Sequence, residues 1–230
     1  MDPSKDDRVE RSIAANWDRV QSLGLMPGIG QKDYQDKVDE GMKRALEFLK
    51  AHGATTITPK LVAVVHKEIF KEVHPWAGNF RLPGQQVMTA WGSEGAHPDR
   101  INDMISHLSA MVTKAFAEKG DERKLHAVAL SHSQLCGIHP FLDGNTRVAW
   151  VITAAQMHQA FGKLAWSAIQ RDQYIDALRS ADERVDLAPL KEMLRQSTGL
   201  QLAANRQNTG PSGKSERLEP QDREGPEYDR

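Results

Sequence analysis

The sequence has little cysteine, no long apolar run and almost no net charge, and each shortage excludes a class of protein. Cys136 is the only cysteine among 230 residues, so no disulfide can form within the chain. No apolar run approaches the roughly 20 residues that a membrane-spanning helix needs. The formal net charge of -1 argues against general nucleic-acid binding. We therefore expect neither a membrane nor a nucleic acid among the partners.

The beginning of the chain lacks the apolar core of a signal peptide, because residues 1–10 are mostly polar and charged. We therefore expect a soluble protein that is cytoplasmic at synthesis, which leaves open a later export as an effector. The length of 230 residues suits one full-sized hydrophobic core and is short for two.

Apolar residues recur at helical spacing along most of the chain, and this pattern predicts an all-α fold. The predicted helices span Val9–Val20, Val38–Leu49, Leu61–Ile69, Ile101–Ala115, Leu125–His139, Val148–Ala155, Tyr174–Leu178 and Leu187–Leu194. Thr58-Pro59 is a start signal for the third, a hydroxyl cap followed by proline. The fourth stripe is the most regular, so we expect all of its apolar residues, Met104 and Met111 included, to face the core.

Glycines and prolines between Pro75 and Pro98 exclude a long helix there. Within this region, residues 85–89 are suited to a short extended arm. An exposed strand edge offers unpaired backbone groups, so it can hold a partner's chain by adding a strand. We therefore interpret this arm as a docking edge for another polypeptide.

Residues 139–147 hold most of the chemical information. They read His-Pro-Phe-Leu-Asp-Gly-Asn-Thr-Arg, between a helix expected to end at His139 and one expected to start with Gly144-Asn145. Phosphates favour helix N-termini, because the first N–H groups lack partners and the macrodipole is positive there. A titratable base, a carboxylate four positions later and a glycine at the helix start therefore indicate a phosphate-handling site.

Each of these residues also has a plainer interpretation. A histidine on an apolar helix face is often a core residue, and an aspartate before a helix is often a cap. The combination of His139 with Asp143, Gly144 and Arg147 favours the chemical interpretation over both. Phe141 is expected to be buried and to anchor the loop.

A zinc site is a further alternative, because His126, His132 and His139 lie on one predicted helix. His132 and His139 are two turns apart, which separates their Cα atoms by about 10 Å, too far for two ligands of one zinc unless the helix breaks. We therefore expect His132 to lie at the edge of the core.

The stretch 139–147 resembles the signature of the Fic (Fido) proteins, which runs H-P-F-x-D/E-G-N-G-R-x-x-R. Upstream, Pro75-Trp76-Ala77-Gly78-Asn79-Phe80-Arg81 is similar to the P-W-A-G-x-x-R segment that leads into the flap of that family. The two motifs come in the family's order. The resemblance covers most of the chain, from about Val38 to Leu194.

The resemblance implies an all-α Fic-type helical domain with a small β-hairpin flap. It divides the chain into an N-terminal helical segment over residues 1–37, the Fic domain over residues 38–198 and a flexible tail over residues 199–230. The flap would cover about residues 79–97 and dock the target protein. Its docking residues would be Gln86, Val87, Met88 and Thr89.

The implied reaction is Mg²⁺-dependent transfer of AMP from ATP, the co-substrate, to a Ser, Thr or Tyr hydroxyl of a target protein. His139 would take the hydroxyl proton, since imidazole titrates near neutral pH. Asp143 would hold the Mg²⁺, which prefers a carboxylate together with phosphate oxygens and water. The nucleotide would be bound at the start of the next helix by Gly144, Asn145, Thr146 and Arg147.

The chain departs from the signature at two positions. Thr146 replaces the second glycine, and Trp150 replaces the second arginine, which binds phosphate in the family. The Doc-like branch also lacks that arginine and transfers the γ-phosphate, so a protein kinase or another phosphate-containing-group transferase is one alternative. A catalytically inactive Fic-derived binding module is another. The family's inhibitory motif S/T-x-x-x-E-G/N is absent, so either a separate antitoxin-like protein restrains this potential toxin, or nothing does.

Roles for the residues around the flap are less sharply predicted. Trp76 and Phe80 are expected to pack at its base. Arg81 is expected to form either an ion pair or a secondary contact. His74 and His97 are interpreted as ordinary loop residues, with contact to the target protein as the alternative.

Overall fold

Residues 16–163 and 170–200 are described by the structure, which is a computed structural model. The elements follow the order α2 (Gln31–His52), α3 (Pro59–Phe70), the 3₁₀ turn η1 (Pro98–Arg100), α4 (Ile101–Ala117), α5 (Asp121–Ile138), α6 (Asn145–Phe161), α7 (Arg171–Glu183) and α8 (Ala188–Thr198). Residues 16–22 are also helical. The first part of the predicted N-terminal helix and residues 201–230 of the predicted tail lie outside the described residues.

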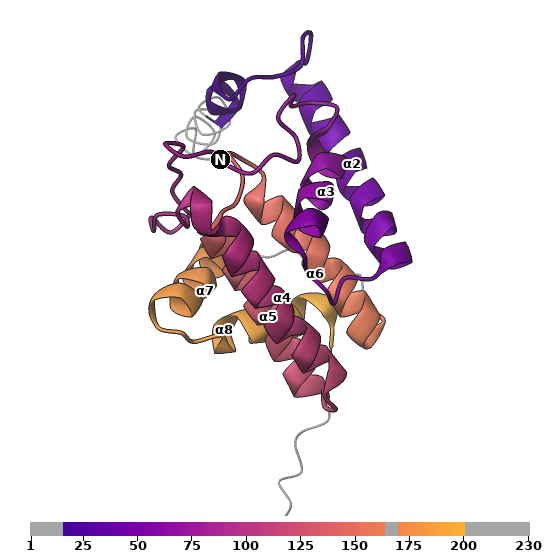
Figure 1. The fold of residues 1–230 in the computed structure, drawn as a ribbon. Helices are drawn as coiled ribbons and strands as arrows, with labels where there is room; N and C mark the ends of the chain where they lie inside the picture. The colour runs from indigo at the N-terminus through magenta and orange to yellow at the C-terminus, as the bar shows by residue number, and fades with distance from the viewer. Residues whose placement is uncertain (1–15, 164–169, 201–230) are drawn as a thin grey trace, which may run out of the picture.

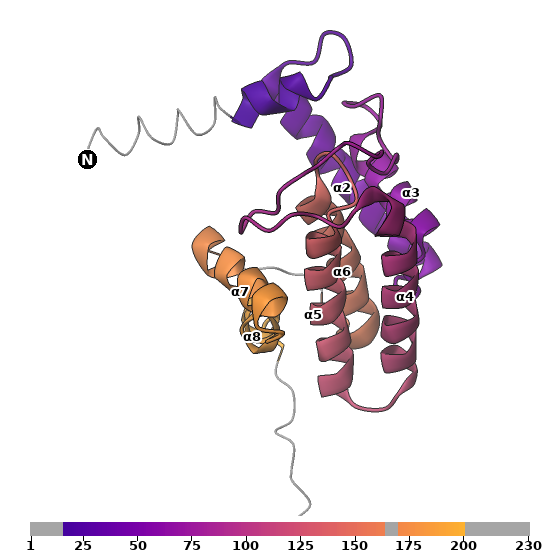
Figure 2. The ribbon, with the colours of Figure 1, turned by 60° about the vertical axis from the view of Figure 1, so that its left-hand side comes forward.

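Two long helices, α5 and α6, occupy the middle of the molecule and pack against each other (Figure 1). Helix α4 lies along α5, and α2 and α3 pack together beside α6. Helices α7 and α8 cover the side of α5 that lies away from α2 and α3, as Figure 2 shows. The all-α prediction is confirmed, and the connection between the two central helices is the motif 139–147.

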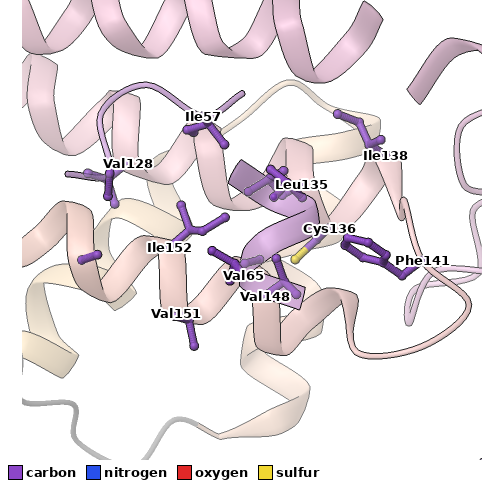
Figure 3. Packing of buried hydrophobic residues seen from close by; sticks show 14 of the residues in the cluster. Ile57, Val65, Val128, Leu135, Cys136, Ile138, Phe141, Val148, Val151 and Ile152 are labelled. Atoms are coloured by element: carbon purple, nitrogen blue, oxygen red, sulfur yellow. The ribbon is translucent and has the colours of Figure 1, made fainter. Parts of the chain in front are cut away.

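The core is built around α5 and α6, because both helices are buried on several sides over much of their length. Figure 3 shows residues of this cluster, with Ile138 and Phe141 at its end near the motif loop. Phe141 has no exposed surface, as predicted for a residue that anchors the loop by burial. The loop is therefore held by the same packing that holds the central helix pair.

The N-terminal pair, α2 and α3, packs closely because of one glycine. A Cβ placed on Gly41 would lie 2.2 Å from the carbonyl oxygen of Ile69, so no larger residue fits without a shift of backbone. Helix α3 begins as predicted, with the hydroxyl of Thr58 accepting a hydrogen bond from the N–H of Leu61 at 3.1 Å. The predicted domain boundary at residues 37 and 38 falls inside α2.

The prediction for α4 was wrong at two residues. Met104 and Met111 are 37% and 42% exposed, although they share the helical spacing of the buried residues. Helix α4 packs chiefly against α5, so it buries only a narrow stripe that includes Ile105 and Val112. Periodicity locates the centre of an apolar face, and the neighbouring elements decide how wide its buried part is.

The flap is a short hairpin. Its one ladder contact among the described residues is an antiparallel bridge between Met88 and Glu94. On either side of it, the N–H of Thr89 bonds the carbonyl of Ser93 at 2.8 Å, and the N–H of Gly95 bonds that of Val87 at 3.0 Å.

The tip of the hairpin is held by a tryptophan. The indole N–H of Trp91 donates to the Asp182 carboxylate on α7 at 2.7 Å, so the flap is tied to the closing helices. Across the described ranges, none of the helices is long and apolar enough to cross a membrane.

Candidate active site

The motif loop joins the end of one central helix to the start of the other. Helix α5 ends at Ile138, and His139 follows in a left-handed conformation with φ 51° and ψ 58°. Helix α6 begins after Gly144, whose φ of 77° suits glycine. A left-handed conformation is uncommon for a residue with a side chain and often marks a functional position. The predicted arrangement, in which the motif loop joins the end of one helix to the start of the next, is present.

His139 is prepared to accept a proton. Its Nδ1 lies 3.0 Å from the carbonyl oxygen of Cys136. A carbonyl can only accept a hydrogen bond, so the neutral ring carries its proton on Nδ1 and leaves the lone pair of Nε2 available. Burial is the main cause that lowers the pKa of His139, and the bond to Cys136 opposes it. The ring is therefore neutral at neutral pH with Nε2 unprotonated, as a general base must be.

The first turn of α6 is shaped to approach an anion. Its leading N–H groups have no intrahelical acceptor, and Gly144 has no side chain to bond them. A Cβ on Gly144 would lie 2.3 Å from the ring of Phe70, so the loop rests directly on α3. Thr146 and Arg147 are partly exposed on this turn. These groups suit phosphate oxygens.

Asn145 organises the loop. Its side chain is buried, its Oδ1 accepts from the N–H of Phe141 at 2.8 Å, and its Nδ2 donates to the Phe141 carbonyl at 2.9 Å. The amide thus closes the loop in the way a backbone pair would. The side-chain amide of Asn145 is therefore engaged within the loop itself.

Asp143 lies between two cations. Its carboxylate contacts the guanidinium of Arg19, from the helical residues 16–22, and lies 4.0 Å from that of Arg147. The side chain is only 12% exposed. It therefore does not serve as the cap of α6, which was its plainer interpretation. The guanidinium of Arg147 also lies over the Phe70 ring, with 5.8 Å from Cζ to the ring centroid.

The surroundings of Asp143 fit a magnesium ion that is held largely by the substrate. In the described part of the chain no group of three or more His, Cys, Asp or Glu side chains forms a metal cage. Mg²⁺ is commonly held by one or two carboxylates, phosphate oxygens and water, so one aspartate beside a phosphate cradle is sufficient. The guanidinium already at this carboxylate shows that the position accommodates a cation.

Arg81 ties the flap to the motif. Its guanidinium donates to the carbonyls of His139 at 2.7 Å, Gln85 at 2.8 Å and Ala96 at 2.6 Å. A fourth, longer contact of 3.4 Å reaches Ile138, and the N–H of Arg81 donates to the Pro140 carbonyl at 2.9 Å. Its partners among the described residues are therefore backbone carbonyls from both ends of the flap and from the motif loop, and no carboxylate forms an ion pair with it there.

His66 supports the loop from below. Its ring is fully buried and stacks on Phe141 with 3.8 Å between centroids. Its Nε2 donates to the Asp143 carbonyl at 3.2 Å, and its Nδ1 accepts from the N–H of Gly78 at 2.9 Å. Burial lowers the pKa of His66 to about 3, so the ring stays neutral and can make both bonds. No pattern in the sequence indicated this role.

Trp150 belongs to a buried cluster between α5, α6 and α7. It packs against His132, with 4.4 Å between the ring centroids, and against Tyr174, with 5.2 Å. His132 is fully buried and bonds Thr153 at 2.9 Å and the Tyr174 hydroxyl at 2.7 Å. It lies in the core rather than at its edge, and burial lowers its pKa to about 3.

His74 is another buried ring, and its interpretation as an ordinary loop residue was wrong. Only 1% of it is exposed, and its Nδ1 donates to the Gly24 carbonyl at 2.8 Å. It stacks on Trp76, whose indole N–H donates to the Leu23 carbonyl at 2.8 Å. The segment before the flap therefore holds the N-terminal residues, including Arg19, against the site. His97 is exposed, as expected of a loop residue.

The proposed docking residues differ in exposure. Met88 is 59% exposed and Gln86 is also exposed, while Thr89 is buried and bonds within the hairpin. The flap passes close to His139, because a Cβ on Gly95 would lie 2.9 Å from the Cβ of that residue. A chain that pairs with the outer part of the hairpin would thus lie beside the catalytic loop.

Comparison with known proteins places this geometry in a family context. Residues 56–157 match the model of the Fic/DOC family. BepC, a VirB-translocated effector of Bartonella tribocorum solved with bound AMPPNP, superposes with a TM-score of 0.58 at 17% identity over 77% of this chain and 92% of that one. The Fic domain of a putative cell filamentation protein of Bartonella quintana, solved with bound ADP, gives 0.57 at 18% identity over 75% and 88%.

A eukaryotic structure is also similar. Fic-1 of C. elegans superposes with a TM-score of 0.59 at 20% identity, over 78% of this chain and 52% of that one. Identities at this level establish the fold and leave the reaction to be argued from the site.

Proposed function

Because residues 56–157 match the model of the Fic/DOC family, we propose that this chain belongs to that family and transfers AMP from ATP to a hydroxyl side chain of a target protein. The observation that carries the proposal is the state of His139. Its ring is neutral, its Nδ1 proton is engaged with Cys136, and its Nε2 is left to take the proton of an attacking Ser, Thr or Tyr.

The first turn of α6 then has two tasks toward ATP. Its backbone N–H groups at Asn145 and Thr146 hold the oxygens of the attacked α-phosphate, on which charge develops. The planar guanidinium of Arg147 suits the β-phosphate of the departing pyrophosphate. Attack of the hydroxyl oxygen on the α-phosphorus forms the new P–O bond, the bond to the β-phosphate oxygen breaks, and the hydroxyl proton passes to His139.

Asp143 would hold Mg²⁺ against the phosphates, and a bound ion there neutralises charge on the nucleotide. The target would lie along the exposed side of the flap, at Gln86 and Met88, with its hydroxyl near His139. The proposal also includes a protein target, restraint of this chain itself by a separate antitoxin-like partner, and activity in the cytoplasm.

The test uses ATP labelled at the α- or the γ-phosphate, incubated with the full chain, Mg²⁺ and a cell lysate. Transfer of the α-label to protein supports adenylylation, and mass spectrometry of the product would show an added AMP. Transfer of the γ-label alone would replace the proposal by a protein kinase. No protein label, together with no heat on titration of Mg-ATP, would indicate an inactive binding module.

The assignment of the base is tested separately. His139→Ala is expected to lower transfer by about 10²- to 10⁴-fold, the usual range for loss of a general base. Nucleotide binding should persist, because the base acts on the hydroxyl. His126→Ala is the matched control, since His126 is an exposed histidine on the same helix. A His139→Ala protein with undiminished transfer would reject the role.

A further inference from the structure

The helical residues 16–22 form a fixed wall of the site. Val20 is 3% exposed, and Trp17 packs edge-on against Tyr34 with 5.7 Å between ring centroids. The carbonyls of Leu23 and Gly24, directly after this helix, accept the bonds from Trp76 and His74. The backbone that carries Arg19 is therefore anchored at several points, although it lies far from the motif in sequence.

The guanidinium of Arg19 lies close to Asp143 and His139 of the motif loop. Its guanidinium contacts the carboxylate of Asp143, and 56% of its side chain is exposed. Burial is the main cause of the lowered pKa of His139, and the charge of Arg19 adds to it, which places this cation within electrostatic reach of the base. The side chain is thus half-exposed at its present contact, while the backbone that carries it is anchored.

A cavity of about 600 Å³ opens beside Arg147, between the helical residues 16–22 and the start of α2. Lys32 and Gln35 also line it, and the hydroxyl of Tyr34 is buried there, where it interacts with the guanidinium of Arg147. Tyr34 as a whole is only 4% exposed. The cationic and donor groups of Lys32, Arg147 and the Tyr34 hydroxyl suit an anionic, oxygen-rich ligand.

The motif has one arginine fewer than the family signature with which it was compared. Trp150 stands where the family signature has its second arginine, and its ring packs toward α7 in contact with His132 and Tyr174. If the function proposed above holds, Mg²⁺ takes the Asp143 carboxylate, and Arg19 loses its present partner. The phosphates of the nucleotide beside that Mg²⁺ would then be the anions available to the Arg19 guanidinium.

We propose that Arg19 is the second phosphate-binding arginine of this site, supplied by the N-terminal helix from the α2 side. It acts with Arg147 on the phosphates beyond the attacked one, and the cavity beside Arg147 accommodates them. This inference rests on the proposed nucleotide binding. It makes the helical residues 16–22 part of the active site, although they lie outside the matched residues 56–157.

The test is calorimetric titration of the full-length protein with Mg-AMPPNP and, separately, with adenosine. Arg19→Ala should weaken Mg-AMPPNP binding by about tenfold, which corresponds to 1.4 kcal/mol, and leave adenosine binding unchanged. Arg19→Lys should recover part of the loss because it keeps the charge. Asp18→Ala is the control, since Asp18 is the exposed neighbour on the same helix.

Two results overturn the inference and are distinguishable. If Arg19→Ala binds Mg-AMPPNP as tightly as the wild type, or more tightly, Arg19 is only the resting counter-ion of Asp143 or an obstacle to nucleotide. If the wild type itself gives no heat with Mg-AMPPNP, the proposed function fails first. A thermal melt of each variant confirms that folding is retained, which is expected for a half-exposed side chain.

Discussion

Replacement of Arg81 by methionine tests whether one side chain holds the flap to the catalytic loop. Methionine keeps much of the volume and removes the donors, so the carbonyls of His139, Gln85 and Ala96 lose their shared partner. Arg81 is only 4% exposed, so little water can replace the guanidinium without opening the structure. We expect both a loss of stability and a looser flap.

The magnitude follows from the three short bonds of 2.6, 2.7 and 2.8 Å. A hydrogen bond from a charged donor contributes about 1.5–3 kcal/mol, and part of that is returned because the methionine no longer buries a charge. The free energy of unfolding should fall by about 3–5 kcal/mol, against a total of about 5–15 kcal/mol for a typical domain. Arg81→Lys should lose less, since an ammonium can satisfy some of the carbonyls but lacks the planar fork.

Urea unfolding followed by circular dichroism measures the stability, and amide hydrogen exchange of residues 85–96 measures the flap. Leu82→Ala is the control, because Leu82 is 64% exposed and its truncation should change stability by no more than about 0.5 kcal/mol. An Arg81→Met protein within about 1 kcal/mol of the wild type, with unchanged exchange in the flap, would show that the carbonyls find other partners.

Two further predictions concern the loop and the buried histidines. Gly144→Ala should unfold more easily than Gly84→Ala, because both glycines have positive φ but only at Gly144 would a Cβ meet a ring, at 2.3 Å. The cost of a left-handed backbone conformation is about 1–2 kcal/mol in both variants, so a difference between them reports the clash. Equal urea midpoints of the two variants would contradict it. Lower pH should destabilise the fold, since the pKa values of His66 and His132 fall from the ordinary 6.5 to about 3 in the folded protein. The unfolded chain then binds more protons between these values, so this stability is present above pH 6.5 and is lost as the pH falls toward 3. Between about pH 7 and 5 the loss is about 2 kcal/mol for each ring. Urea unfolding at both pH values checks it; His132→Gln should reduce the dependence, and a pH-independent wild type would refute it.

The sequence predicted the helices and the motif loop because their signals are local. The stripes of α2, α5 and α6, the Thr58 cap and the glycine at the start of α6 act within a few turns of chain. The width of a buried face is not local, and this is why Met104 and Met111 were assigned to the core and are exposed.

The support around the site was mostly unpredictable for a related reason. Arg81 bonds backbone carbonyls, which every residue carries, so no partner could be recognised in the sequence. Arg19 reaches a carboxylate 124 positions away, and His66 reaches a carbonyl 77 positions away. Such contacts depend on which helices become neighbours. Residue type and spacing identified the groups of the motif, and only the packing shows what holds them.

The stacked rings of His66, His74 and Trp76 have a practical consequence for anyone trimming this protein. A chain begun at residue 56 would keep the whole signature, yet the carbonyls that receive the protons of Trp76 and His74 would be missing. The N–H groups of Trp76 and His74 would then be buried beneath the loop without acceptors, and the helical residues that carry Arg19 would be missing. A truncated protein should therefore begin before residue 16. If a shorter fragment were inactive, the loss of these contacts would explain it, and the result would not show that the full chain is inactive.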